Sequence, residues 1–563
     1  MYEELAVDIL ILGGGGAGLM AALHARQHDP SLRIALAAKG LVGQSGCTRM
    51  VQGGYNAVLD PQDSFDLHFK DTILGGGYLN DQELAWLLVN EAPRVIRELE
   101  HLGCFFDRTP DGRIYQKAFA GQTFDRTVHR GDLTGIEIMS RLKDNILSAD
   151  VILLDEHRAV SLLTGGSGQV DGALLLDLRT GKFLTVSAKA TLMATGGGAR
   201  MYSIAAPSLE KVGDGMALCY QAGCIMQDME MYQFHPTGIV AGKSILTGAV
   251  LEEGLRGVGG RLYNNRGERF MERYDPERME RSTRDTVSRA GYLEIQAGRG
   301  TEDGAVLLDV SHLGAEFVES NFPGMVERCR EVGMDLARVP VKVSPTAHFH
   351  MGGSRIDTRC QSNLHSLFIA GEDSGGVHGA NRLGGNGVAE STVFGTLAGD
   401  AMAEFVMHQP QPMIDANQIE EAMTDILQPL RNNGDENIFS LRREIEELMW
   451  DKGGIVRSAW GLTSALEELD QISQRASRAP MPPVLEYNLA WQEWLNVRSL
   501  LTVARLTCVS ALARQESRGS HYRDDFPETD NRNWLCNVMV QQTPDGSPRV
   551  WTEAVQLTRL RPE

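Results

Sequence analysis

The sequence predicts an α/β fold that begins with a Rossmann-like domain, and two observations carry this prediction. An apolar run at residues 6–12 leads directly into a glycine-rich turn at 13–18, which is followed by the start of a helix. Two later buried runs, at 190–195 and 367–370, also end in glycine-rich segments. The first of these is expected to end beside a nucleotide bound at the turn, and the second to return the chain to the first domain.

The glycine turn has the spacing of a dinucleotide-binding fingerprint. Gly13, Gly15 and Gly18 fit G-x-G-x-x-G, in which the glycines permit a tight turn, close approach of a pyrophosphate and packing of helix on strand. The helix N-terminus would then offer N–H groups and a positive dipole end to the phosphates. The next strand, residues 33–38, is followed by Lys39 where an acid would bind the ribose of NAD, so the generic rule disfavours NAD.

The remaining elements follow from hydrophobic periodicity and from proline and glycine. Residues 80–103 have the pattern of an amphipathic helix that Pro93 should kink or restart. Residues 236–350 are rich in arginine and glycine, which suggests a separate lid domain. Strands are expected at 151–155 and 171–178, and helices at 417–432, 438–451, 457–475 and 487–515, broken by the proline-rich segment 479–483.

These elements predict a nucleotide-binding domain in two parts with another domain inserted between them. The predicted ranges are 1–235 and 351–410 for the nucleotide-binding domain, 236–350 for the inserted capping domain, 411–530 for a helical domain and 531–563 for a C-terminal segment.

Composition excludes several classes of partner. The 563 residues carry a formal net charge of −20 and no basic cluster, which argues against nucleic acid and against direct docking on an anionic membrane. No apolar run approaches the roughly 18–20 residues that span a bilayer, and the acidic start is no signal peptide. The eight cysteines include no C-x-x-C pair, so neither a zinc site nor an iron–sulfur cluster is expected. We therefore expect a cytoplasmic protein without a metal site.

Four segments have the character of a small anion site. They are residues 233–238, 284–289, 348–353 and 377–387, and most of them combine a charged or imidazole side chain with glycine or proline. Each also has an ordinary structural interpretation. His235 next to Pro236 could be a turn histidine, Arg284 a surface salt-bridge residue, and Asn386 the N-cap of a helix.

Together with the glycine turn, these segments resemble the flavoprotein subunit of succinate dehydrogenase and fumarate reductase, a family that also includes L-aspartate oxidase. The resemblance covers nearly the whole chain and includes residues 51–54, 111–116, 195–198, 516–519 and 533–536. It implies a Rossmann-like FAD-binding domain with an inserted α+β capping domain, followed by a helical domain. The family tolerates a missing ribose acid, so the resemblance implies FAD as the cofactor.

The resemblance also implies roles for individual residues. Arg284 would exchange a proton with one substrate carbon while flavin N5 exchanges hydride with its neighbour, and Glu253 and Arg256 would relay that proton. The carboxylates of a C4-dicarboxylate would be held by His235, His348 and Arg382. Glu372 would hold ribityl or ribose hydroxyls, and a helix starting near Asn386 and Gly387 would direct its positive end at the flavin. The implied cofactor-binding residues are Gly13, Gly15, Gly16, Ala17, Gly18, Lys39, Gly53, Gly54, Gly196, Asp214, Glu372, Asn386 and Gly387.

Three positions depart from the family pattern. Cys47 occupies the place of the histidine that carries covalent FAD, which predicts a noncovalent FAD and easier fumarate reduction; a thioether at Cys47 is the alternative. Phe119 and Gln122 match the succinate dehydrogenase branch, whereas aspartate oxidase would place a glutamate at Gln122 to meet the substrate ammonium. Glu252 stands where the family has a threonine that binds a substrate carboxylate.

A glutamate beside a bound dianion is repulsive by about 1–4 kcal/mol. Four explanations are therefore open for Glu252: it points away, Thr247 substitutes for the missing threonine, it is protonated, or the substrate is not plain fumarate.

The leading hypothesis is an FAD-dependent oxidoreductase that interconverts succinate and fumarate, or a close analogue. Because the chain has no cluster ligands of its own, it is expected to pair with an iron–sulfur protein, and it would reach the inner face of the cell membrane only through other subunits. The alternatives are an L-aspartate oxidase-like enzyme that uses oxygen or fumarate, and a flavin-binding scaffold without turnover.

Overall fold

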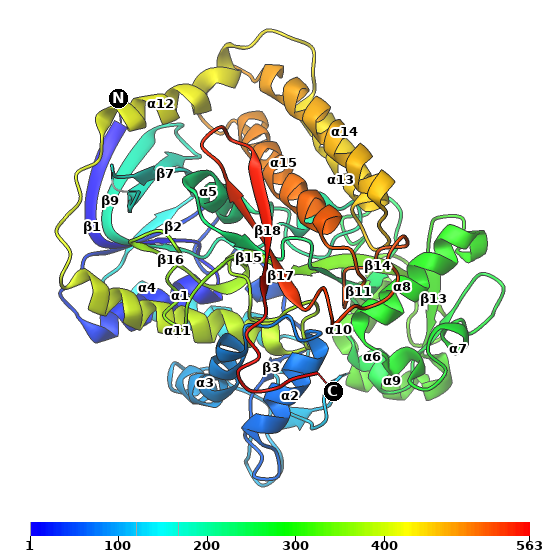
Figure 1. Cartoon of the computed structure of the whole chain (residues 1–563). Helices are drawn as coiled ribbons and strands as arrows, with labels where there is room; N and C mark the ends of the chain where they lie inside the picture. The colour runs from blue at the N-terminus through cyan, green and yellow to red at the C-terminus, as the bar shows by residue number, and fades with distance from the viewer. Residues whose placement is uncertain (1, 120, 167, 563) are drawn as a thin grey trace.

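The computed structural model describes residues 2–119, 121–166 and 168–562, and its largest sheet has seven strands, which lie at the left of Figure 1. The strand order is β6-β2-β1-β9-β8-β7, with β16 paired to β9 as well. β1, β2, β6, β9 and β16 are parallel, and β7 and β8 are antiparallel additions. The strands are β1 (Tyr2–Leu12), β2 (Ile34–Ala38), β6 (Ile152–Asp155), β7 (His157–Thr164), β8 (Val170–Asp177), β9 (Phe183–Met193) and β16 (Leu367–Ile369).

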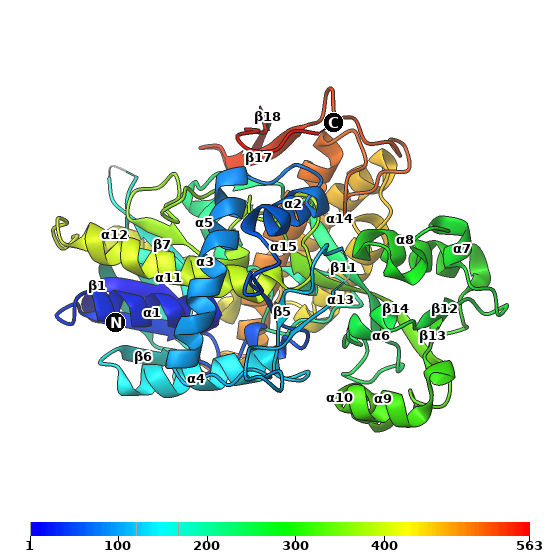
Figure 2. The same ribbon diagram turned by 90° about the horizontal axis from the view of Figure 1, so that it is seen from below.

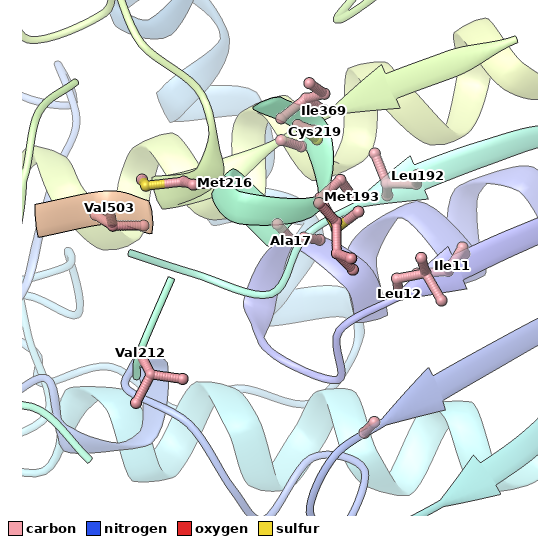
Figure 3. Close-up of a cluster of buried hydrophobic side chains, with 14 of the residues drawn as sticks. Ile11, Leu12, Ala17, Leu192, Met193, Val212, Met216, Cys219, Ile369 and Val503 are labelled. Atoms are coloured by element: carbon pink, nitrogen blue, oxygen red, sulfur yellow. The ribbon is translucent and has the colours of Figure 1, made fainter. Parts of the chain in front are cut away.

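The parallel strands end together at one edge of this sheet. Leu12 is paired with Met193, and Met193 in turn with Ile369, so three distant chain segments finish side by side. Their side chains share one buried core with Ala17 of α1 (Gly16–His28), as Figure 3 shows. Ligands of α/β sheets bind beyond the carboxyl ends of the strands, so this edge positions the site.

Helices cover the sheet and pack closely against one another. α11 (Asn386–Val406) lies against α1, and the contact needs glycine: a Cβ on Gly395 would lie 2.4 Å from the carbonyl oxygen of Ala17. The other helices of this domain are α2 (Phe65–Gly75), α3 (Gln82–His101), α4 (Thr134–Ser148) and α5 (Asp214–Ala222). α3 continues through Pro93, so of the two expected effects, a kink or a restart, the restart does not occur. Burial of its apolar face, which includes Leu88, Ala92 and Ile96, offsets the single hydrogen bond that proline removes.

A second, antiparallel sheet with its own core forms the capping domain. Its strand order is β11-β14-β13-β12, and Figure 2 shows this domain at one side of the molecule. The strands are β11 (Tyr232–Ile239), β12 (Arg261–Tyr263), β13 (Val306–Asp309) and β14 (Val341–His350). The helices are α6 (Gly254–Gly257), α7 (Met271–Tyr274), α8 (Arg284–Glu294), α9 (Ala315–Asn321) and α10 (Pro323–Glu331).

Two small sheets fasten loops to the domain of the seven-stranded sheet. β3 (Tyr55–Asn56), β5 (Thr127–Val128) and β4 (Gln116–Lys117) form an antiparallel sheet beside the capping domain. β15 (Gly353–Ser354), β10 (Met226–Gln227), β17 (Cys536–Gln542) and β18 (Pro548–Ala554) form the other, which joins the C-terminal hairpin to the domain of the seven-stranded sheet.

The helical region comprises α12 (Ala416–Leu427), α13 (Ile438–Lys452), α14 (Ala459–Arg478) and α15 (Leu489–Ala513). α15 is long and apolar enough to cross a membrane by length and composition, with a mean hydropathy of 1.2, which the sequence-based expectation missed. In the structure, 61% of the most apolar 18-residue stretch of this helix is buried within the protein. Its Val503 packs against the backbone of Gly198 and Gly213, so α15 is a core helix that supports the domain of the seven-stranded sheet.

Candidate active site

One cavity of about 640 Å³ connects the glycine turn with the capping domain. It is lined by residues 13–17 and Lys39 at one end and by His235, Arg284, His348 and Arg382 at the other. Gly13 has a φ of +122°, and a Cβ there would lie 2.0 Å from the carbonyl oxygen of Ala194, so only glycine allows β1 and β9 to end this close together. The cavity has the extended form that a dinucleotide requires.

Most of the residues expected to bind the cofactor line this cavity. Gly13, Gly15, Gly16, Ala17, Lys39, Gly53, Gly54, Gly196, Asp214, Glu372 and Gly387 do so. Gly18 and Asn386 do not. Gly18 instead lets α1 pack on β1, because a Cβ there would meet the carbonyl oxygen of Gly13, which fits the packing role that its place in the fingerprint predicts.

Asp214 and Lys39 form an ion pair at the nucleotide end. The Nζ atom of Lys39 lies 2.7 Å from Asp214 Oδ2, and Arg158 contacts the other carboxylate oxygen at 2.6 Å. Burial opposes ionisation, but the charges of Arg158 and Lys39 outweigh it and lower the pKa of Asp214 to about 2. The lysine that replaces the expected acid is therefore held in place by a fixed carboxylate.

Two acids follow β16, and one of them, Glu372, lines the cavity. Glu372 is paired with Lys211 and accepts a hydrogen bond from the backbone N–H of His350 at 2.8 Å. Asp373 accepts from the backbone N–H groups of Thr195 and Gly196, and so holds the glycine turn after β9. Sequence reasoning missed Lys211 and Asp373, although an acid directly after a buried strand was a usable signal for Asp373.

The N-terminus of α11 is held by a buried amide network. Gly385, with a φ of +87°, is the N-cap, and Asn386 is the first helical residue, so the interpretation of Asn386 as the N-cap is wrong. The Oδ1 atom of Asn386 accepts from Asn56 at 2.8 Å and from His68 at 3.0 Å. Gly387, one residue further on, lines the cavity.

At the capping end, one carboxylate joins two guanidinium groups. Glu253 Oε2 accepts from Arg284 Nη2 at 2.6 Å, and Glu253 Oε1 accepts from Arg256 Nη2 at 3.0 Å. All three side chains are buried. Burial opposes its charge, but Arg284 and Arg256 hold the pKa of Glu253 below its usual range. Arg256 does not line the cavity; it lies behind Glu253.

Gln233 joins these groups to the third arginine. Its Oε1 atom accepts from Arg284 Nη1 at 2.9 Å and from Arg382 Nη2 at 3.1 Å, while its amide N–H groups donate to the Asn381 side chain and the Arg382 carbonyl. We call Gln233, Glu253, Arg256, Arg284 and Arg382 the arginine cluster. Sequence reasoning quoted the segment around Gln233 but gave this residue no role.

Arg382 has no acid within ion-pair distance among the described residues. Its guanidinium group lies 4.5 Å from the ring centre of Phe349, and its Nε atom is buried without a hydrogen-bond partner among the described residues. Burial, followed by the charge of Arg284, lowers the pKa of Arg382 to about 9. A buried cation without a counter-ion is a strong point of attachment for a carboxylate.

The two histidines are neutral donors or acceptors. Burial, followed by the charge of a neighbouring arginine, lowers the pKa of His235 and of His348 well below the usual value. The backbone N–H of Thr237 donates to His235 Nδ1 at 3.3 Å, which assigns the proton to Nε2. The rings lie 5.7 Å apart, and both residues line the cavity.

Thr247 and Gln122 are engaged elsewhere. Thr247 lines the cavity, but its hydroxyl donates to the Gly242 carbonyl at 2.9 Å and accepts from the Ala241 N–H, so the idea that it substitutes for the missing threonine finds no support in its hydrogen bonds. Gln122 does not line the cavity and donates to Asn56 and to the Gly384 carbonyl, both at 2.9 Å. Phe119 lies against Gly53 and Gly384 in the cavity wall.

Glu252 lines the cavity and is paired with a residue that the sequence did not single out. Lys117 Nζ lies 2.6 Å from Glu252 Oε1. The carboxylate is 5% exposed, so the buried charge is compensated by this contact. The partners are far apart in the chain, and nothing in the local sequence predicts their contact.

The described residues hold no cluster of three or more His, Cys, Asp or Glu side chains that could bind a metal. The cysteines are all free, and burial raises the pKa of the Cys47 thiol.

Comparisons with known proteins agree with this architecture. Residues 8–388 match the family model described as FAD binding domain, and residues 442–563 match that described as fumarate reductase flavoprotein C-term. The chain is 44% identical over 545 residues to one of the subunits of the fumarate reductase (CoM/CoB) of Methanothermobacter marburgensis, covering 96% of this chain and 98% of the relative. It is 45% identical to an uncharacterised FAD-dependent oxidoreductase of Methanocaldococcus jannaschii, covering 95% and 96%. A structure of the Escherichia coli quinol fumarate reductase flavoprotein superposes with a TM-score of 0.95 at 32% identity, covering 100% and 98%.

Proposed function

The chain belongs to the family of fumarate reductase and succinate dehydrogenase flavoprotein subunits, and from this premise we propose how its residues carry out the reaction. It is an FAD-dependent oxidoreductase that interconverts succinate and fumarate as the flavoprotein subunit of a complex. The geometry of the arginine cluster supports specific roles for its members.

The residues present fit FAD. Gly13 to Ala17 would receive the pyrophosphate, Glu372 the ribityl or ribose hydroxyls, and the N-terminus of α11 the flavin ring. Bound FAD supplies hydride exchange at its N5 position. We propose that it is held without a covalent bond, because burial raises the pKa of the Cys47 thiol and disfavours the thiolate that a thioether would need.

The observation that carries the substrate assignment is the charge of the arginine cluster. Three guanidinium groups face one carboxylate, Glu253, which leaves two positive charges in excess. The ion pairs of Glu372 with Lys211 and of Glu252 with Lys117 add nothing to this excess. Two uncompensated positive charges match a dicarboxylate dianion, and Arg382 and the Nε2–H of His235 provide donors for its carboxylates.

Proton transfer is assigned to Arg284. Arg284 lines the cavity and donates to Glu253, which also lines it and in turn contacts Arg256 behind the wall. A proton that leaves Arg284 for one substrate carbon can be replaced along this chain of hydrogen bonds. Gln233 and Glu253 fix the orientation of the guanidinium group, and Gly384 leaves the space for it, since a Cβ there would lie 3.3 Å from Arg284 Nη2.

Electrons are exchanged with another subunit, since the relatives include the flavoprotein subunit of an 8-methylmenaquinol:fumarate reductase. An iron–sulfur protein is the partner that we propose, because the described residues offer no cluster site that would carry electrons to or from the flavin. We place the protein in the cytoplasm, with contact to the inner face of the membrane only through other subunits, since a net charge of −20 opposes direct binding to an anionic bilayer.

The experiment is an anaerobic reoxidation. The flavin of the purified protein is reduced chemically, fumarate is added and the visible spectrum is followed. We expect fast reoxidation by fumarate and none by crotonate, which has a carbon–carbon double bond to accept the hydride but offers a single carboxylate to the same cluster. A flavin that stays reduced in the presence of fumarate would refute the assignment.

A further inference from the structure

Lys117 and Glu252 connect the two domains that enclose the cavity. Lys117 is on β4, in the small sheet of the FAD-binding domain, and Glu252 immediately precedes Glu253 and α6 of the capping domain. Their contact is 2.6 Å, and the side chains are 21% and 5% exposed. The lysine also lies 5.7 Å from the ring centre of Phe119, which lines the cavity.

Without Lys117, the carboxylate of Glu252 would be an uncompensated negative charge in the cavity wall. It would cancel half of the excess of two positive charges on which dianion binding depends, and it would offer an acceptor to any ligand with an ammonium group. With Lys117 in place, the Lys117–Glu252 pair is neutral, and the excess of two positive charges in the arginine cluster is unchanged.

We infer that Lys117 is a positioning residue that, by neutralising and holding Glu252, makes the cavity select dicarboxylates without an amino group over amino dicarboxylates. The inference rests on the proposed dicarboxylate site. It also adds a further answer to the question that Glu252 raised in the sequence: the carboxylate stays in the cavity wall, and a lysine from the other domain compensates its charge.

The test compares full-length, FAD-loaded wild type with Lys117→Met, Glu252→Gln and the double variant, and it includes Lys117→Arg and Lys189→Met as controls. Binding of fumarate and of L-aspartate to the oxidised enzyme is measured by calorimetry under anaerobic conditions at fixed ionic strength. Oxidised flavin has no electrons to give to fumarate, so the Kd for fumarate is measured without turnover.

For Lys117→Met we expect the Kd for fumarate to rise roughly 10- to 100-fold, because a charge near the ligand is no longer balanced. The ratio of the L-aspartate Kd to the fumarate Kd should fall by a similar factor. The double variant should return to within roughly threefold of the wild type, since it removes both charges. Lys117→Arg, which keeps the charge, should also stay close to the wild type.

Lys189→Met is the matched control. Lys189 is 24% exposed and forms a 2.7 Å ion pair with Asp8, neither of which lines the cavity, so this variant should bind fumarate as the wild type does. If Lys117→Met fails to fold, Glu252→Gln carries the test. It leaves the charge of Lys117 unbalanced beside the cavity, so the Kd for fumarate should fall and the ratio of the L-aspartate Kd to the fumarate Kd should rise. An unchanged or weaker affinity for fumarate would mean that the pair acts only as a structural contact between the domains.

Three outcomes would overturn the inference: an unchanged fumarate Kd in Lys117→Met, no recovery in the double variant, or an unchanged ratio between the two ligands. Wild-type protein that binds no fumarate at all would refute the proposed function instead, so the two failures can be told apart.

Discussion

Replacing Gln233 by glutamate should abolish tight dicarboxylate binding with little change in shape. Gln233 is neutral and accepts hydrogen bonds from Arg284 at 2.9 Å and from Arg382 at 3.1 Å. A glutamate would keep both of these contacts but would add a negative charge inside the arginine cluster. It would also lose the two hydrogen bonds that the amide donates to the Asn381 side chain and the Arg382 carbonyl, a loss that the methionine variant below shares. The excess of two positive charges would fall to one.

The structure sets the size of this effect. A carboxylate held by Arg382 would lie roughly 6 Å from the new charge, because the guanidinium nitrogen stands between them at hydrogen-bond distance from each. At an effective dielectric constant of about 20, two like charges at that separation repel by about 3 kcal/mol. Such an energy corresponds to a roughly 100-fold rise in the Kd for fumarate.

The assay is anaerobic calorimetry with fumarate on the oxidised protein, together with FAD content and Tm. Gln233→Met is the matched control, because it removes the amide without adding charge; its Kd should rise much less, and its main defect should be a lower rate of flavin reoxidation. A Gln233→Glu protein that carries FAD and binds fumarate within threefold of the wild type would refute the charge argument.

Three further predictions concern proton transfer, the flavin linkage and stability. Arg284→Ala should slow flavin reoxidation by fumarate by roughly 10²- to 10⁴-fold with unchanged FAD content; normal rates in a stopped-flow measurement would place proton transfer elsewhere. Acid precipitation of the wild type should release all flavin into the supernatant, and flavin absorbance retained in the pellet but lost in Cys47→Ser would show a thioether instead. His24 contacts Glu98 at 2.5 Å and Asp400 at 3.1 Å, and although burial opposes it, these acids raise its pKa from 6.5 to about 9. Because the folded-state pKa is the higher one, this interaction should contribute about 3 kcal/mol of stability below pH 6.5 and lose it as the pH rises through 9. The Tm difference between wild type and His24→Gln should therefore shrink between pH 6.5 and 10, and a constant difference would contradict the assignment.

Features that depend on local pattern could be predicted from the sequence. The turn after residues 6–12 required glycine at Gly13 because two strands end there, and the same constraint is visible in the spacing of the motif. The buried runs that became the ends of β9 and of β16 were apolar because both faces of a parallel sheet are covered. Pro93 shows the limit of such rules, since tertiary packing kept α3 continuous.

Features that depend on pairing between distant segments could not be predicted. Glu252 was visible as an anomaly, but its partner Lys117 lies in the other domain, and a lysine on a short strand carries no local signal. The role of Gln233 is hidden for the same reason: an amide becomes a bridge between arginines only when β11, α8 and the loop that carries Arg382 are assembled. The resemblance of the sequence to the family could predict Arg284 and Arg382 as site residues, but it could not predict the hydrogen bonds that hold them.

The interrupted order of the parallel sheet has a consequence for synthesis in the cell. The ribosome makes the glycine turn at Gly13 first. Glu372, which lines the same cavity, follows β16 and is made only after the whole capping domain. At about 5–20 residues per second, roughly 20–70 s separate the two on the ribosome. During that time the nascent chain exposes an unfinished sheet edge and cannot retain its cofactor, so the flavin must enter late, and a ribosome that stops within the capping domain yields a product that cannot hold FAD.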